Sequence, residues 1–269
     1  MKKPLVVYLS VTFLDKEHLI NFQKFYKKFE SGYSHDLLIC FKNENKLKNK
    51  EFKKLVDLKY IYFEDNHSVN DYDIGSFYRI AKKFPDRNIL FLGTYTYPIN
   101  HNWLKIFVDN YKERCVLGAS GSYASISSQH LSFYHKKHTK FQQLRWGLKH
   151  FTNVKLFPNP HIRTTGFYVK SSDFIKLKFN LNNLKKKIYT NYFESGREGM
   201  SSQFLKKGYK LYIVNSDGIK FDIKDWPKSE TFCIGDQKKT IFSDKLSREY
   251  HQMNWVDKKK TSYNCWGKK

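Results

Sequence analysis

The stretch NILFLGTYTYPINHNW, from Asn88 to Trp103, decides the fold class. Its first five residues are wholly apolar, as expected for a central strand of a parallel sheet, which is buried on both faces. From Trp103 to Tyr111 the apolar residues recur at helical spacing. Ligands of open α/β sheets bind beyond the carboxyl ends of the strands. The segment GTYTYP, Gly93 to Pro98, is therefore the first place to expect a site.

Further strands and helices alternate along the chain. Other strands are expected at Leu5 to Ser10, His35 to Phe41, Tyr60 to Phe63, Cys115 to Ser122, Phe167 to Val169 and Lys210 to Val214. Other helices are expected over 19–29, 51–58, 71–84, 171–176 and 201–207. This order predicts an α/β fold with a mostly parallel central sheet flanked by helices. Residues 130–150 show no clear period.

The pattern weakens after Asp217 into a polar and aromatic tail. We therefore divide the chain into a main domain, residues 1–220, and an irregular C-terminal extension, residues 221–269, packed on the same domain. A chain of 269 residues is long enough to bury one good-sized core.

The formal net charge of +24 indicates a preference for polyanionic partners, such as nucleic acid, phosphosugars or anionic lipid. The alternative is a solvated, lysine-rich surface with no specific partner. Aromatic residues make up 17% of the chain and charged residues 28%, so the composition is that of a globular protein. The four cysteines lack the CxxC spacing of a zinc site and favour reduced thiols in a cytoplasmic protein.

Several motifs share their order with one enzyme class. GTYTYP follows the central strand, FPNPHIRTTGFYV and FESGREGMS come later, and a Gly-aromatic pair closes the segment that ends at Val214. From Leu5 to Asp217 the chain resembles GT-A-fold glycosyltransferases, in particular a bacterial polysaccharide or O-antigen branch similar to glycosyltransferase family 2. The resemblance implies a Rossmann-like sheet that binds a nucleotide sugar.

The chain departs from that class where the central strand should end in a DxD-type motif that holds a divalent metal. Gly93 to Thr96 contain no carboxylate, so a hard cation would lack its usual oxygen ligands. We therefore expect no cofactor and no metal, with Mn²⁺ or Mg²⁺ as the alternative. A tight strand-to-loop exit stopped by a proline would also explain GTYTYP.

Donor contacts are expected at several places that the resemblance points to. Positive side chains would stabilise the departing diphosphate, and threonine hydroxyls would bind the sugar or a phosphate oxygen. The expected donor-binding residues are Thr12, Asp71, Asp73, Gly75, Thr94, Thr96, His161, Arg163 and Arg197. Asp71 has the alternative role of an ordinary helix N-cap. Arg163 has the alternative role of an ion-pair partner for Glu194 or Glu198.

A glycosyl transfer with inversion needs a general base near the acceptor hydroxyl, and a carboxylate is usual in the class. Glu194 and Glu198 are the two catalytic candidates, with Glu194 preferred because it lies in the more distinctive FESG fragment. Inversion is assumed only on the resemblance of this segment. The alternative is that either residue is a first-turn glutamate favoured by the helix dipole.

Acceptor contacts are expected at Ser120 and Ser122 of GASGS, where small residues let a ligand approach the backbone, and at Trp226. Trp226 could stack on a sugar face, although core packing is the more ordinary role of a tryptophan.

The sequence thus predicts a cytoplasmic glycosyltransferase of cell-surface polysaccharide synthesis. The donor would be a UDP-, dTDP- or GDP-sugar, and the acceptor a glycan or a lipid-linked glycan. The basic surface suits peripheral contact with the anionic inner membrane face. The alternatives are a basic nucleic-acid-binding protein, for which no known motif is present, and a non-catalytic glycosyltransferase-like binding module.

Overall fold

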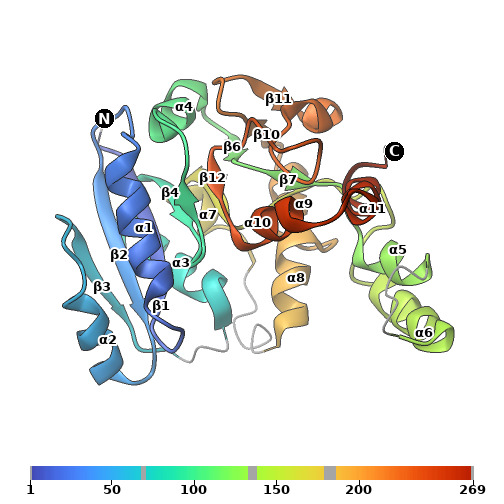
Figure 1. Ribbon diagram of the computed structural model, residues 1–269, viewed down its shortest axis with the longest axis horizontal. Helices are drawn as coiled ribbons and strands as arrows, with labels where there is room; N and C mark the ends of the chain where they lie inside the picture. Colours follow the sequence, from blue (N-terminus) through green and yellow to red (C-terminus); the bar gives the residue numbers. More distant parts are fainter. Residues whose placement is uncertain (1, 68–70, 133–137, 179–185, 268–269) are drawn as a thin grey trace.

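A computed structural model of the chain describes residues 2–67, 71–132, 138–178 and 186–267 (Figure 1). Within these residues, eight strands form one sheet in the order β11-β10-β6-β9-β4-β1-β2-β3. Their bounds are β1 Leu5–Val11, β2 Asp36–Lys42, β3 Ile61–Asp65, β4 Asn88–Leu92, β6 Cys115–Gly118, β9 Gly166–Lys170, β10 Lys210–Val214 and β11 Lys220–Asp222. Two small ribbons pair β5 Tyr97–Pro98 with β12 Phe242–Ser243, and β7 Gly121–Ser122 with β8 His161–Ile162.

The sheet is mostly parallel, which confirms the fold class expected from the sequence. β1 pairs in parallel with β2 and with β4, β2 with β3, and β10 with β6. β9 lies antiparallel between β4 and β6, and β11 is an antiparallel edge. The central strands are apolar and fully buried because helices cover both faces of the sheet.

The helices form two layers around the sheet. Their bounds are α1 Glu17–Lys28, α2 Lys46–Lys53, α3 Tyr72–Lys83, α4 Trp103–Asn110, α5 Ile126–Leu131, α6 Lys140–Phe151, α7 Ser171–Phe174, α8 Lys187–Ser195, α9 Met200–Lys206, η3 Ile223–Ser229, α10 Lys245–Gln252 and α11 Trp255–Trp266. α1 and α4 bury Phe22 and Phe107 on one face. α3, α7 and α9 bury Phe77, Phe174 and Phe204 on the other.

The second helix differs from its expected position at 51–58. α2 begins earlier because the Asn45 side chain caps it, accepting a hydrogen bond from the Leu47 N–H. It ends at Lys53 because the Gln23 side chain of α1 binds the backbone beyond it, donating to the Leu55 carbonyl and accepting from the Asp57 N–H. A tertiary contact therefore overrides the local helical pattern.

Residues 221–267 return to the main sheet in ordered elements. The Tyr123 N–H donates to the Cys265 carbonyl at 2.8 Å, and Trp266 Nε1 donates to the Phe232 carbonyl at 2.7 Å. β12 pairs with β5 just beyond the GTYTY turn, and α10 follows it directly. This arrangement brings the start of α10 to the end of the central strand.

Two further findings concern the sequence expectations. All four cysteines are free and buried. Within the described residues, no helix is both long and apolar enough to cross a membrane.

A buried network of four charges fixes where α3 begins. Lys42, at the end of β2, has a side chain only 1% exposed, and its Nζ donates to the Asp71 carboxylate and to the Tyr72 carbonyl. Arg79 Nε donates to Asp65 Oδ1 at 2.9 Å, and its Nη1 donates to Asp71 Oδ2 at 2.6 Å. The two cations and two carboxylates therefore tie α3 to the ends of β2 and β3.

The network also stabilises a strained residue at the start of α3. Tyr72 has φ of 49°, in the left-handed region that residues with a side chain rarely adopt. The hydrogen bond from Lys42 to its carbonyl, 2.6 Å long, holds this conformation. Asp73 follows directly, so the network determines where its carboxylate points.

Replacing Lys42 tests this role. Lys42→Met should lower the free energy of unfolding by about 3 kcal/mol, because removing one partner of a buried ion pair leaves an uncompensated charge. Urea unfolding measures the loss. Lys27→Met is the control, since Lys27 pairs with Asp57 at the surface, and it should cost less than about 1 kcal/mol. Equal losses in the two variants would contradict the assigned role of the network.

Candidate functional site

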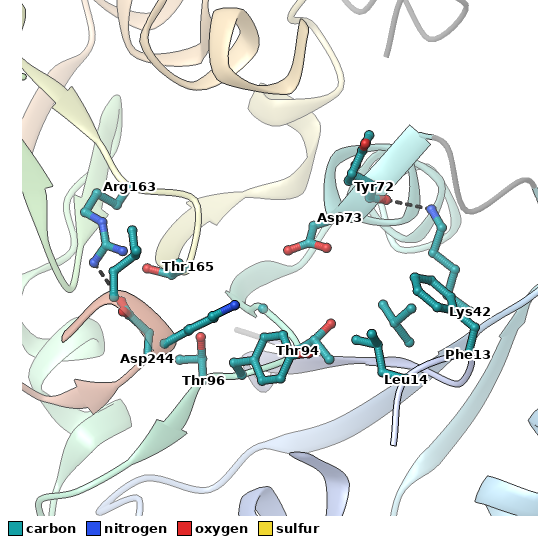
Figure 2. Close-up of a pocket in the computed structure, with 15 residues that line it drawn as sticks. Phe13, Leu14, Lys42, Tyr72, Asp73, Thr94, Thr96, Arg163, Thr165 and Asp244 are labelled. Carbon is teal, nitrogen blue, oxygen red and sulfur yellow. Dashed lines mark hydrogen bonds and ion pairs between the residues drawn. The ribbon is translucent and has the colours of Figure 1, made fainter. Parts of the chain in front are cut away.

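A pocket of about 350 Å³ opens at the carboxyl ends of β1 and β4 (Figure 2). One wall is apolar and comes from the loop after β1; its residues are Val11, Phe13 and Leu14. The floor is the turn after the central strand, from Gly93 to Thr96. The end of β2, the start of α3, the 163–165 loop and the start of α10 supply the remaining sides. The pocket therefore lies where the sequence predicted a site.

The turn after β4 is tight, and two of its N–H groups are used within the fold. The Gly93 N–H donates to the Thr165 carbonyl at 3.1 Å, and the Thr96 N–H donates to the Gly93 carbonyl at 3.0 Å. Pro98 lies in β5, which begins directly after the turn. The turn is thus a tight strand exit, as the alternative interpretation had it, and it also lines the pocket.

A carboxylate does reach the end of the central strand, but it comes from α3. A Cβ built on Gly93 would lie 3.3 Å from Asp73 Oδ2 and 3.6 Å from Thr96 Oγ1. Figure 2 shows the Asp73 carboxylate directed into the middle of the pocket. Gly93 leaves space for this carboxylate, which explains why the strand ends in a glycine where an aspartate was expected.

The Asp73 carboxylate is in an unfavourable place for a charge. Burial raises its pKa to about 6 despite the opposing effect of Lys42, and the carboxylates of Glu194 and Asp71 add to the rise. Within the described part of the chain, Asp73 makes no ion pair or hydrogen bond of its own. An unpaired carboxylate with a pKa near neutrality is suited to accept a proton from a bound molecule.

Thr94 also presents an unused polar group. Its carbonyl accepts a hydrogen bond of 2.6 Å from the Tyr8 hydroxyl, which fixes the backbone of the turn. Its Oγ1 is buried and has no hydrogen-bond partner, although Thr94 lines the pocket. Because buried polar groups are almost always paired, this hydroxyl is a candidate ligand contact.

Arg163 is held at the opposite end of the pocket by Asp244. Its Nη1 lies 2.6 Å from Asp244 Oδ2 and 3.2 Å from Ser120 Oγ, and the guanidinium carbon lies 3.7 Å from the centre of the Phe232 ring. Burial opposes ionisation of Asp244, but Arg163 beside it keeps the pKa of that carboxyl below its usual value. The alternative pairing of Arg163 with Glu194 or Glu198 is therefore wrong.

Glu194 lies behind the pocket, near its wall. Its Oε1 accepts a 2.8 Å hydrogen bond from the Thr164 N–H, next to the pocket residue Thr165. It belongs to the last turn of α8, so the alternative of a first-turn glutamate is wrong for it. The helix dipole disfavours a carboxylate there. The hydrogen bond to the 163–165 loop therefore explains the position of Glu194.

His161 lies on β8, close enough to Glu194 for their charges to interact. Its Nδ1 is 2.8 Å from the Asn159 carbonyl. Burial lowers the pKa of His161, and the Glu194 carboxylate opposes that shift. It is 8% exposed and does not line the pocket.

Glu198 and Arg197 face away from the pocket. The Glu198 side chain is 73% exposed and pairs with Lys206, whose hydrogen bond lowers the pKa of Glu198. Arg197 Nε donates to the Phe151 carbonyl at the end of α6 at 3.3 Å, and its guanidinium lies over the Phe151 ring. Neither residue is among those that line the pocket.

Three of the expected donor residues serve structural contacts here. Thr12 Oγ1 donates to Asn49 Oδ1 at 2.7 Å, which joins β1 to α2. Asp71 occupies the N-cap position of α3, but its side chain caps no backbone N–H and pairs with Lys42 and Arg79 instead. A Cβ on Gly75 would lie 2.0 Å from Asp71 Oδ2, so this glycine makes room for that carboxylate.

The expected acceptor residues lie on the buried side of the pocket wall. Ser120 accepts the hydrogen bond from Arg163, and Ser122 Oγ accepts one from the Ala124 N–H at 3.0 Å. Trp226 is fully buried and would touch a Cβ built on Gly121 at 2.9 Å. Trp226 therefore packs in the core, which was the alternative role considered from the sequence.

The lining residues that were not singled out from the sequence include Phe13, Lys42, Tyr72 and Lys245. Phe13 and Lys42 follow the strand-end rule, since they lie at the ends of β1 and β2. Lys245 opens α10, which Asp244 begins with a capping box to Ser247. The sequence DKLS indicates the start of a helix, but no feature of this segment shows that α10 reaches the pocket.

The lining residues do not form a divalent-metal site by themselves. Of the two carboxylates in the lining, Asp244 is held by Arg163, which leaves Asp73. Nowhere in residues 2–67, 71–132, 138–178 and 186–267 do three or more His, Cys, Asp or Glu side chains gather in a metal-binding group. A hard cation takes six or more oxygen ligands, several of them carboxylates when the protein supplies the site.

No protein-family model matches the chain, and no curated protein does. Solved structures similar to it include mouse xyloside xylosyltransferase 1 (10% identity, 78% of this chain and 82% of that one, TM-score 0.39). Core-mannan synthase A from Aspergillus fumigatus, in a Mn/GDP form, and galactosyltransferase LgtC, with donor and acceptor sugar analogs, each share 8% identity over 79% of this chain and 73% of theirs, with TM-scores of 0.44. At these identities and TM-scores the similarities do not identify the chemistry of the pocket.

The pKa of Asp73 predicts an unusual effect of its removal. Below about pH 4 the carboxyl is protonated in both folded and unfolded chains, so it costs no stability. As the pH rises from the ordinary pKa of 3.8 through the folded pKa of about 6, the unfolded chain ionises first and the native chain loses stability. Asp73→Asn should therefore be more stable than wild type at pH 7.5, by up to about 3 kcal/mol.

Urea unfolding of both proteins between pH 4 and pH 8 measures this difference. The gap should open between about pH 4 and 6 and stay constant above that range. A variant less stable than wild type at pH 7.5 would mean that Asp73 is a structural residue.

Proposed function

We propose that the pocket binds a nucleotide-diphosphate sugar and transfers its sugar to a glycan or lipid-linked glycan without a metal. The observation that carries the proposal is an unpaired, high-pKa carboxylate, Asp73, in the middle of a pocket with one apolar wall. A carboxylate that served only a structural salt bridge would be held by a cation and would not face the pocket unpaired. Charge held at a structural cost is typical of a reacting site.

The apolar wall suits the base of a nucleotide. Phe13 is 59% exposed and lines the pocket beside Leu14, so its ring is available for stacking. Figure 2 shows Phe13 and Leu14 on the side opposite to Arg163 and Asp244. A donor bound with its base on Phe13 would extend across Thr94 and Asp73.

The diphosphate needs positive charge that is not already paired within the fold. Arg163 and Lys42 are each held by a carboxylate. Lys245 lines the pocket with an exposed side chain, whose contact with Glu249 is 4.0 Å long. It can turn toward a bound phosphate, where a cation stabilises the developing charge of the leaving group.

Asp73 is the better placed of the carboxylates to act as general base. In an inverting transfer the acceptor oxygen forms a bond to the anomeric carbon, and the bond to the diphosphate breaks with its electron pair. The acceptor proton passes to the Asp73 carboxylate, which is mostly ionised at pH 7 with a pKa of about 6. Glu194 then positions the 163–165 loop and raises the pKa of Asp73.

The setting proposed for this activity is the one expected from the sequence: bacterial cell-surface polysaccharide synthesis, in the cytoplasm, with contact to the inner membrane face. The missing DxD motif belongs to the same proposal, because Asp73 takes the space at the end of the central strand. A nucleic-acid-binding function gains no support, since many of the aromatic rings pack against one another in the core, as Phe91 does against Phe77 and Phe167.

Turnover of UDP-, dTDP- and GDP-sugars in EDTA tests the proposal, with hydrolysis or transfer followed by chromatography of the released nucleotide. Asp73→Asn should lower kcat by about 100-fold or more, because a general base contributes that factor. Glu198→Gln is the matched control and should retain wild-type turnover, since Glu198 faces solvent.

Three outcomes would contradict parts of the proposal. Normal turnover by Asp73→Asn would remove the base assignment. Turnover that EDTA abolishes and Mn²⁺ restores would remove metal independence. Donor binding without turnover under every condition would identify a binding module.

A further inference from the structure

Helix α6 exposes an apolar stripe to solvent. Phe141, Leu144, Leu148 and Phe151 are 74%, 44%, 59% and 43% exposed. Their spacing of three, seven and ten residues from the first places them on one face of the helix. Exposed apolar residues are ordinary one at a time, but a continuous stripe of two phenylalanines and two leucines marks an interaction surface.

The opposite side of α6 is anchored, so the stripe faces outward in a fixed orientation. A Cβ on Gly147 would lie 2.7 Å from the Leu131 side chain, which shows how closely α6 packs on α5. His150 Nδ1 lies 2.6 Å from the Tyr192 hydroxyl of α8. The N-terminus of α6 is fixed by a capping box between Thr139 and Gln142. Figure 1 shows α5 and α6 at one end of the molecule.

The charge around the stripe has one sign. Lys140, Arg145 and Lys149 lie on α6, and all three are exposed. Within the described residues none of them has an ion-pair partner. The sequence contains no Asp or Glu from Arg114 to Ser172, so no acidic side chain from this segment offsets them. The surface is therefore apolar along its centre and positive at its margins.

This combination fits a lipid surface better than a protein groove. A helix with Phe and Leu on one face and Lys and Arg beside them lies in the interface of a bilayer, with its apolar face among the acyl chains. Anionic headgroups attract each nearby Lys or Arg by about 1 kcal/mol. α6 spans only about 18 Å, and a lipid surface needs no matching groove to cover so short a stripe.

We propose that the outer face of α6 docks the protein on an anionic lipid bilayer. No residue of α6 lines the pocket, so the inference does not rest on the proposed catalytic activity. It locates a membrane contact on one helix and assigns the stripe of Phe141, Leu144, Leu148 and Phe151 as the inserted part.

Co-sedimentation of the full chain with vesicles tests the inference. Vesicles of phosphatidylcholine with about a third of phosphatidylglycerol should bind the protein at least ten times more strongly than pure phosphatidylcholine. Leu148→Glu should lower that binding at least tenfold, because a charge then enters the apolar stripe. The paired change Arg145→Gln with Lys149→Gln should lower it and weaken its salt dependence.

A matched control separates disruption of the apolar stripe from the effect of the added negative charge. Leu47 on α2 is 68% exposed between Lys46 and Lys48, and α2 lies at the other end of the molecule (Figure 1). Leu47→Glu adds the same negative charge outside the stripe and should leave vesicle binding within about twofold of wild type. Circular dichroism confirms that each variant is folded.

The inference fails if wild type does not sediment with anionic vesicles. It also fails if Leu47→Glu and Leu148→Glu weaken binding equally, because bulk charge alone would then explain the effect. The remaining alternative is that the stripe binds a second copy of the chain, and light scattering without lipid tests it. A wild-type dimer that Leu148→Glu makes monomeric, with vesicle binding unchanged, would assign the stripe to a second copy of the chain.

Discussion

The buried ion-pair network of Lys42, Asp65, Asp71 and Arg79 determines the geometry of the candidate site. It holds the start of α3 against the ends of β2 and β3, and it stabilises the left-handed backbone at Tyr72. The free-energy cost of removing four charges from water offsets much of their mutual attraction. The network therefore determines the position of α3 more than it adds to stability. What it positions is Asp73, the next residue along the chain after Tyr72.

The position of Asp73 gives a physical reason for the unusual end of the central strand. Gly93 is small enough for the Asp73 carboxylate to lie above it, and an aspartate on the strand itself would compete for that space. The negative charge near the strand end therefore comes from a neighbouring helix. With one unpaired carboxylate, the pocket is suited to proton transfer and does not by itself supply the oxygen ligands of a hard-cation site.

The fold was predictable because each central strand is short, apolar and flanked by a clear helical period. Leu5–Val11 and Asn88–Leu92 follow directly from that pattern. α2 was misplaced because Gln23, far away in the sequence, binds the backbone after it. Local periodicity contains no information about such a contact.

The site was predictable only in part, for a related reason. Asp73, Thr94 and Thr96 line the pocket as the strand-end rule suggested, and Arg163 lines it as the resemblance implied. The ion pair of Arg163 with Asp244 joins residues far apart in the sequence and could not be read from either segment. Glu198 was the second base candidate, but the turn between α8 and α9 directs it to solvent, where it pairs with Lys206.

The central claim is that the pocket takes a nucleotide sugar with no metal, and thermal unfolding with UDP-, GDP-, CMP- and dTDP-sugars tests it most directly. A ligand that binds only the folded chain must raise its stability, by about 2.7 kcal/mol at a hundred times its Kd. The account predicts a rise in Tm for one donor in EDTA, unchanged by Mn²⁺. No rise for any donor, or a rise that requires Mn²⁺, would contradict it.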